Sequence, residues 1–266
     1  FNVQFAHEIY DKNKLISPEG TFNHLEFRPL EGFIFAVTPF NFTSIAANLP
    51  SAPALMGNVA IWKPASSSVY SGYFLMKLFQ EAGLPDGVIN FIPGKGSEVG
   101  NMIIANQDLA GVHFTGSTEV FQGMWNQIGS NIHNYKTYPR IVGETGGKDF
   151  ILAHKSSDIH ALSTAMVRGA FEYQGQKCSA ASRCYIPKTI WNDVKESYIN
   201  QVSTIKMGDI NNFTNFMNAV IDENSFDRIA QYIDYAKASD ECVIITGGNY
   251  DKSIGYFIEP TTILTT

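Results

Sequence analysis

Cysteine is scarce in this 266-residue chain, which contains three, at positions 178, 184 and 242. They lack the C-x-x-C spacing of zinc sites, and pairing any two of them would leave the third as a free thiol. A disulfide-stapled scaffold is therefore not indicated, and we expect a reducing compartment. The six histidines form no i,i+4 pair, so we expect no metal site.

Basic residues and long apolar runs are also few. Lys and Arg total 19 against 25 Asp and Glu, which gives a formal net charge of −6. Nucleic acid is not an expected partner of an acidic chain without a basic cluster. No apolar run approaches the roughly 18–20 residues that a membrane span requires, so we expect no transmembrane helix. With 44% hydrophobic residues, the chain can still fill a core, and we expect a globular protein.

Several motifs and boundary signals are missing as well. There is no G-x-S-x-G turn of a serine hydrolase. The glycine-rich turns near Gly96 and Gly116 are incomplete forms of the dinucleotide and phosphate-loop patterns. The first residue is not Met, and the last residues stop within a β-branched run that has no evident partner strand. We therefore expect a chain that is cut at both ends.

What the sequence does contain is a regular alternation of apolar runs and helical periods. The runs predicted as strands in the first half are 32–37, 59–62, 88–92 and 112–115. Each is followed by a turn and then by a helical pattern, and their continuous apolarity favours burial on both faces. We therefore expect an α/β fold with a mostly parallel sheet, whose ligands bind at the carboxyl ends of the strands.

The alternation continues in the second half, after a change of composition near 144–149. Strands are predicted at 140–143, 150–153, 184–186 and 243–246, and helices at 159–173, 191–205 and 226–238. Near the start, residues 1–12 have helical spacing, and 24–28 alternate as an edge strand does. We expect two domains, 1–145 and 146–266, with the second incomplete at its C-terminal end.

One cysteine has an unusual setting. Cys178 lies in the stretch FEYQGQKCSAASR at 171–183, next to Gln176, Lys177 and Ser179 rather than among branched aliphatic residues. A buried structural cysteine usually has apolar neighbours. A thiol on a polar turn can instead become a nucleophilic thiolate, if a helix end or a cation lowers its pKa.

Other candidate residues follow the predicted strands. Asn41 can donate its amide N–H to an oxyanion, or it can cap the next helix. Lys63 can bind a phosphate or a ribose hydroxyl, or it is an exposed strand-end lysine. Ser97 and Gly116-Ser117 precede helices whose N-termini suit an anion. Glu144, in a glycine-rich turn, is a general base if burial raises its pKa, or else a solvated turn acid. His113, within an apolar run, is interpreted as a core or hydrogen-bonded residue.

Five segments in this order resemble the aldehyde dehydrogenase superfamily: TPFNF, WKPAS, FTGSTEVF, ETGGKDF and FEYQGQKCSAASR. The stretches EFRPLEGF, EAGLPDGVINFIPG and NAVIDENSFDRI look most similar to the mitochondrial 1-pyrroline-5-carboxylate (glutamate-γ-semialdehyde) dehydrogenases. The resemblance covers essentially the whole chain. It implies a Rossmann-like, parallel-sheet NAD-binding domain at 1–145 and a partial α/β catalytic domain at 146–266.

The resemblance also implies roles for particular residues. Cys178 would be the nucleophile, Asn41 and the Cys178 backbone N–H would hold the oxyanion, and Glu144 would activate the hydrolytic water. Residues implied to contact the cofactor NAD are Thr38, Pro39, Phe40, Lys63, Ser66, Gly96, Gly116, Ser117 and Val120. Residues implied to line the substrate pocket are Phe42 and Ser179. Many family members have an acidic residue where this chain has Ser66, so the choice between NAD and NADP stays open.

The implied reaction is the NAD-dependent oxidation of L-glutamate γ-semialdehyde to L-glutamate, a step of proline catabolism. The implied location is the mitochondrial matrix, and the implied assembly is a homodimer or larger homo-oligomer with a strand near 22–29 at its interface. Three alternatives remain open. They are an aldehyde dehydrogenase of other substrate range, a non-catalytic subunit of an assembly, and a cysteine hydrolase or acyltransferase that uses no nucleotide.

Overall fold

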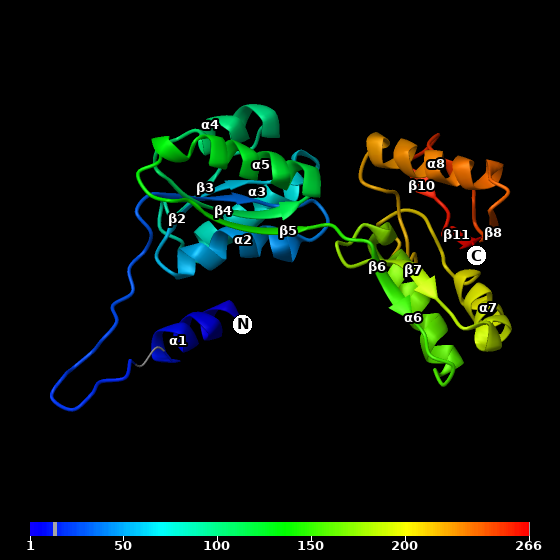
Figure 1. Ribbon diagram of the computed structural model, residues 1–266. Coiled ribbons are helices and arrows are strands. Elements are labelled where there is room, and N and C mark those ends of the chain that lie inside the picture. The colour runs from blue at the N-terminus through cyan, green and yellow to red at the C-terminus, as the bar shows by residue number, and fades with distance from the viewer. Residues whose placement is uncertain (13–14, 266) are drawn as a thin grey trace. The chain divides into compact units, whose positions relative to one another are not determined.

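The computed structural model describes residues 1–12 and 15–265. They separate into two compact units, Phe1–Thr145 and Gly146–Thr266, which we describe one at a time (Figure 1). The roles expected for them, NAD binding and catalysis, stay predictions at this point.

A fully parallel sheet forms the centre of the first unit. Its strands are β1 (Phe33–Val37), β2 (Val59–Lys63), β3 (Ile89–Phe91), β4 (Leu109–Gly116) and β5 (Arg140–Thr145). Their order is β3-β2-β1-β4-β5, and every neighbouring pair is parallel. The expected parallel α/β fold is thereby confirmed. The chain moves outward from β1 first in one direction and then in the other, which is the doubly wound arrangement.

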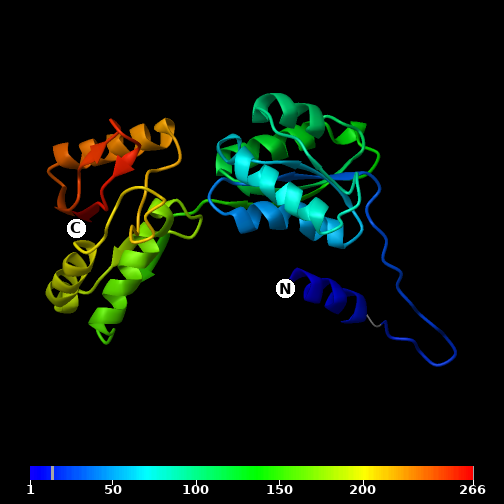
Figure 2. The ribbon, with the colours of Figure 1, turned by 180° about the vertical axis from the view of Figure 1, so that it is seen from behind.

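Helices cover both faces of this sheet, as the continuous apolar strands predict. The helices of this unit are α1 (Asn2–Lys12), α2 (Thr43–Leu55), α3 (Val69–Glu81), α4 (Asn101–Ile104) and α5 (Thr118–Ser130), with short turns η1 (Ser66–Ser68), η2 (Gly96–Gly100) and η3 (Ile132–Asn134). Side chains of α2 and α3 pack around buried Trp62, and those of α4 and α5 pack around Phe35 and Phe114. Figure 1 shows α2 on one side of the sheet and α4 and α5 on the other, and Figure 2 gives the view from behind.

The interior of α2 contains Pro50 and Pro53. Pro53 has no N–H, so the carbonyl of Leu49 lacks the donor that an α-helix would supply four residues later. The Nδ1 atom of His113, in β4, lies 3.0 Å from that carbonyl oxygen. Burial lowers the pKa of His113, which favours the neutral ring with its proton on Nδ1. The interpretation of His113 as a hydrogen-bonded residue is confirmed.

Up to residue 265, the second unit contains three strand pairs, three α-helices and the short turn η4. Its elements are β6 (Asp149–Leu152), α6 (Ile159–Phe171), η4 (Glu172–Gly175), β7 (Ala181–Tyr185), α7 (Lys188–Val202), α8 (Glu223–Ala238), β8 (Cys242–Thr246), β9 (Tyr250–Asp251), β10 (Phe257–Ile258) and β11 (Thr262–Thr265). β6 pairs with β7 in parallel, whereas the pairs β8–β11 and β9–β10 are antiparallel. One core joins α6 to α7 around Val194, and another joins α8 to the strands near Ile258.

One expectation about strands was wrong, because the C-terminal run does have a partner: β11 pairs with β8. Residues 22–29 form no strand in the single chain and are exposed. An interface strand takes its backbone hydrogen bonds from a second copy, so the oligomerisation strand near 22–29 stays a prediction. The two-residue strands β9 and β10 were not predicted, because they are too short to produce a periodic pattern.

Among the helices of residues 1–12 and 15–265, none has the length and apolar composition that a membrane-spanning segment needs.

We expect the substitution His113→Leu to lower the free energy of unfolding by about 1–3 kcal/mol, because the Leu49 carbonyl loses its donor. The folded pKa of His113 lies below its unfolded value of about 6.5. Protonation places a charge on the buried ring, and the unfolded chain binds more protons than the folded one. The stability that the buried neutral ring contributes is therefore complete above about pH 6.5 and decreases as pH falls toward the folded pKa.

Urea unfolding followed by tryptophan fluorescence at two pH values measures this effect. His133, an exposed histidine in the same unit, provides the control His133→Leu. The same pH dependence in the wild type and in His113→Leu would contradict the assignment.

Candidate active site

The candidate residues of the first unit gather at one edge of the sheet. In the strand register, Val37 lies opposite Lys63 of β2 and Phe114 of β4, and Thr115 lies opposite Glu144 of β5. The strands are parallel, so their carboxyl ends point the same way. The turn after β1, Lys63, the β4–α5 turn and Glu144 therefore share the edge at which doubly wound sheets bind ligands.

The turn after β1 begins at Thr38, which is held in place by two hydrogen bonds. Thr38 is 2% exposed, its Oγ1 accepts a hydrogen bond from Trp62 Nε1 at 2.9 Å, and its N–H donates to the carbonyl of Lys63 at 3.1 Å. Pro39 is also buried, whereas Phe40 is exposed. The Thr38 hydroxyl is thus engaged in the core, and we assign Thr38 the positioning of this turn.

Asn41 is half-buried, with its Oδ1 atom enclosed by protein. The N-cap residue of α2 is Phe42, and it forms no side-chain cap hydrogen bond. Because Asn41 precedes the cap position, the alternative that it caps this helix is wrong. The role of oxyanion donor stays a prediction.

Lys63 is 6% exposed, which rules out the alternative of an exposed strand-end lysine. Its Nζ donates to the carbonyl of Pro64 at 3.0 Å, and burial lowers its pKa. A Cβ on Gly96 would lie 3.8 Å from Lys63 Cε, so the turn at Gly96 lies beside the lysine side chain. An ammonium has three donors, and the hydrogen bond to Pro64 uses one of them. Ser66, at the start of η1, is exposed.

The turn between β4 and α5 has little room for a side chain. A Cβ on Gly116 would lie 2.7 Å from the ring of Phe114. Ser117 is the N-cap of α5, and its Oγ accepts from the N–H of Val120 at 3.4 Å. The hydroxyl of Ser117 therefore takes one of the donors that an anion at this helix end could otherwise use. Val120 itself is 52% exposed.

Glu144 differs from the expectation. It belongs to β5 rather than to the glycine-rich turn, and it is exposed, so the described part of its unit does not bury the carboxylate. The preceding residue has a steric reason to be glycine, because a Cβ on Gly143 would lie 2.2 Å from Phe121 Cζ. Phe121 stacks on Phe114, with ring centroids 5.3 Å apart, so it cannot move aside freely.

Cys178 belongs to the second unit, in a turn between η4 and β7, and is half-buried. The neighbouring Lys177 forms an ion pair with Glu172, with Nζ and Oε2 2.9 Å apart. A Cβ on Gly147 would lie 3.6 Å from the carbonyl oxygen of Cys178, so the chain that follows β5 runs beside the cysteine turn. Ser179 is exposed. The thiol is therefore on a polar, partly open turn, as its sequence neighbours predicted.

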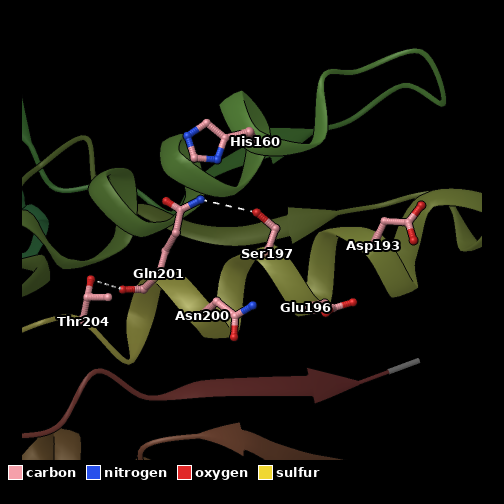
Figure 3. Close-up of a pocket in the computed structure, with 7 residues that line it drawn as sticks. All are labelled: His160, Asp193, Glu196, Ser197, Asn200, Gln201 and Thr204. Carbon is pink, nitrogen blue, oxygen red and sulfur yellow. Dashed lines mark hydrogen bonds between the residues drawn. The ribbon is translucent and has the colours of Figure 1, made fainter.

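A surface cleft of about 520 Å³ lies elsewhere in the second unit (Figure 3). Its lining residues are His160, Asp193, Glu196, Ser197, Asn200, Gln201 and Thr204. None of them is a candidate site residue. In the part of the chain that the structure describes, no group of three or more His, Cys, Asp or Glu side chains could hold a metal ion. The cleft is therefore separate from the residues that the sequence analysis singled out.

Two residues that the sequence analysis missed act next to the candidates. Trp62 fixes Thr38, and Glu172 holds Lys177. The contact of Trp62 could have been predicted from the sequence, because a tryptophan within an apolar strand needs an acceptor for its N–H. The contact of Glu172 with Lys177 could not, because the backbone between them is not helical and the residue spacing of a regular helix does not apply.

Comparison with protein families and known proteins gives a consistent result. The family model described as "Aldehyde dehydrogenase family" matches residues 1–266. The chain is 51% identical to the mitochondrial Delta-1-pyrroline-5-carboxylate dehydrogenase of Dictyostelium discoideum, over 99% of this chain and 48% of that protein. It is 44% identical to the corresponding protein of Danio rerio, over 100% of this chain and 48% of that one.

Solved structures agree. A Delta-pyrroline-5-carboxylate dehydrogenase from Mycobacterium tuberculosis, solved bound with NAD, superposes with a TM-score of 0.96 at 47% identity. That match covers 100% of this chain and 49% of the other. A 1-pyrroline-5-carboxylate dehydrogenase from Thermus with bound NAD gives a TM-score of 0.85 at 27% identity, over 98% of this chain and 51% of the other. The chain thus spans about half the length of the relatives it matches.

We expect Cys178 and Cys184 to differ in reactivity. Burial raises the pKa of Cys184, so little of it is thiolate near neutral pH. We expect limiting iodoacetamide at pH 7.5 to alkylate Cys178 before Cys184, as measured by peptide mass spectrometry over time. Alkylation in urea provides the control, because there the thiols lose their folded surroundings and react at similar rates. Equal rates for the two residues in the folded protein would contradict this account.

Proposed function

The chain belongs to the aldehyde dehydrogenase family, and we propose that it is part of an NAD-dependent enzyme that oxidises L-glutamate γ-semialdehyde to L-glutamate in proline catabolism. The observation that carries the proposal is the arrangement of strand ends. Within the first unit, the turn after β1, Lys63 and Glu144 stand on one sheet edge. Within the second unit, Gly147 lies beside the polar turn that contains Cys178. The names of the relatives support the choice of substrate.

In the proposed reaction, the Cys178 thiolate attacks the aldehyde carbon. A carbon–sulfur bond forms, and the carbonyl oxygen becomes an oxyanion, which gives a thiohemiacetal on Cys178. The side-chain amide of Asn41 and the backbone N–H of Cys178 donate hydrogen bonds to that oxygen. Donors that are already in place at the developing charge lower the barrier, because they need no reorganisation during the reaction. Phe42 and Ser179, next to these two residues in the sequence, line the substrate pocket.

We propose that the carboxyl edge of the first unit binds the dinucleotide. Lys63 ends β2 at that edge and is buried, Gly96 lies beside its side chain, and the N-cap of α5 follows Gly116. We propose that Lys63 binds ribose hydroxyls and that the pyrophosphate lies near Gly116, Ser117 and Val120. Thr38 holds the turn in which Pro39 and Phe40 line the groove. NAD, when bound, accepts the hydride that leaves the thiohemiacetal carbon.

Loss of the hydride leaves a thioester on Cys178, which water must hydrolyse. Glu144 takes a proton from that water, the water oxygen bonds to the acyl carbon, and the Cys178 thiolate leaves. Its exposed position at the end of β5 gives the carboxylate access to water. The choice between NAD and NADP depends on Ser66, which is neutral and exposed, and the NAD-bound relatives favour NAD.

The names of the relatives bear on location. Several of them are named as mitochondrial, which supports a mitochondrial location, and within the mitochondrion we propose the matrix. We also propose a homodimer or larger homo-oligomer. Residues 22–29 would then pair as an edge strand with a second copy, which would cover the apolar side chains of Phe22, Leu25 and Phe27 that are exposed in the single chain.

The test is NADH formation from L-glutamate γ-semialdehyde by the full-length protein. We expect Cys178→Ser to lower kcat by about 1,000-fold or more, because a serine hydroxyl is a far weaker nucleophile than a thiolate. The substitution Cys242→Ser, at another half-buried cysteine, should leave the rate unchanged.

No NADH from a folded protein would overturn the proposal. Thioester hydrolysis without any thermal shift on adding NAD would favour the hydrolase alternative. NADH from other aldehydes but not from the semialdehyde would favour a dehydrogenase of different substrate range.

A further inference from the structure

The turn that leads to Cys178 has an unusual backbone. Tyr173 has φ 55° and ψ 35°, and Gln174 has φ 58° and ψ 30°. Among residues 1–12 and 15–265, Tyr173 and Gln174 are the only non-glycine residues with positive φ. Gly175 follows them with φ 68°. L side chains rarely adopt this left-handed conformation, and two in a row are held only where tertiary contacts impose it. Such contacts must therefore act on the segment between α6 and Cys178.

Two glutamine side chains supply these contacts. The Gln174 amide is oriented so that its oxygen and its nitrogen each have a hydrogen-bond partner. The oxygen accepts from the backbone N–H of Asn218 at 2.8 Å, and the nitrogen donates to the carbonyl of Tyr173 at 2.9 Å. Gln176 Oε1 accepts from the backbone N–H of Ile221 at 3.2 Å. Both glutamines thus bind the left-handed turn to the segment Asn218–Ile221, which is more than forty residues away in the sequence.

The segment Asn218–Ile221 is itself held by hydrogen bonds to its neighbours. The Asn218 side chain donates to the carbonyl of Gly208 at 2.8 Å, and the N–H of Val220 donates to the carbonyl of Tyr256 at 2.9 Å. Val220 is 6% exposed, and Asp222 caps α8 by accepting from the N–H of Ser225 at 2.8 Å. The strained turn is therefore attached to a part of the core that leads directly into a long helix.

An ion pair joins the residues that precede and follow the left-handed turn. Lys177, which precedes Cys178, lies 2.9 Å from Glu172, at the end of α6, and both side chains are mostly buried. The hydrogen bond from Lys177 lowers the pKa of Glu172, and so does Arg168, which also contacts it. The residues before and after the left-handed turn are thus drawn together next to the cysteine.

We propose that Gln174 and Gln176 are positioning residues for the nucleophile. Through Asn218 and Ile221 they hold the strained turn in the one shape that presents the Cys178 thiol. The inference rests on the proposed function for its catalytic meaning, but the presentation of the thiol can be measured without turnover.

The first experiment compares Gln176→Leu with Gln176→Glu in the full-length protein. Leucine removes the acceptor for the Ile221 N–H, whereas a carboxylate keeps it. We expect Gln176→Leu to slow iodoacetamide alkylation of Cys178, and to lower kcat, by about 10- to 100-fold, because small displacements of a reacting group have effects of this size. KM for NAD should not change, because the proposed cofactor residues belong to the first unit. Gln176→Glu should restore both rates.

Gln201→Leu provides the matched control. Gln201 is also half-buried in the second unit and bonds to Ser197 and Thr164, but it belongs to the cleft of Figure 3. Its loss should leave the alkylation rate of Cys178 unchanged. An unchanged Cys178 alkylation rate in folded Gln176→Leu would overturn the inference, whether or not the protein oxidises the semialdehyde. Absence of NADH in the wild type would count against the proposed function alone.

A second pair of variants tests the left-handed backbone at Tyr173. This test does not depend on whether Gln176→Leu folds. Tyr173 is 53% exposed, so its side chain can be replaced with little loss of packing. Glycine adopts positive φ without strain, and valine adopts it poorly. We expect Tyr173→Gly to keep the wild-type alkylation rate of Cys178 and Tyr173→Val to lower it by about tenfold or more. Equal alkylation rates in the two variants would overturn the inference.

Discussion

Parallel pairing of strands between two layers of helices is the constraint on which the first unit depends. The helices bury most of β1, β2 and β4, which are largely apolar, whereas the edge strand β5 is largely exposed. Parallel direction then places all the carboxyl ends at one edge. Thr38, Lys63 and Glu144 share that edge for this reason, although they are spread over more than a hundred residues of sequence.

In the second unit, a strained backbone turn positions the candidate cysteine. The end of α6 would carry the chain onward in helical register, but the left-handed residues Tyr173 and Gln174 turn it out of that path just before Cys178. The energy of such a turn must come from elsewhere, and here the hydrogen bonds to Asn218 and Ile221 supply it. In both units, the polar candidate residues are therefore positioned by packed or hydrogen-bonded neighbours that take no part in the chemistry.

The sequence was sufficient for some features and not for others, for physical reasons. Burial leaves a periodic pattern, so the strands of the parallel sheet and most helices were predicted close to their observed bounds. Tertiary contacts leave no such pattern. The hydrogen bond from Trp62 to Thr38 depends on strand register, and the positive φ of Tyr173 runs against the preference of tyrosine. The exposure of Glu144 depends on what packs beside β5, which residue types alone do not determine.

In the proposed reaction, Cys178 forms the acyl intermediate, and Glu144 helps water to hydrolyse it. The most direct measurement is peptide mass spectrometry of full-length Glu144→Gln protein, quenched after mixing with NAD and L-glutamate γ-semialdehyde. We expect one equivalent of NADH and a glutamyl thioester on the peptide that contains Cys178. NADH formation that continues at the wild-type rate, or an acyl group on Cys184 or Cys242 instead, would contradict the proposed reaction.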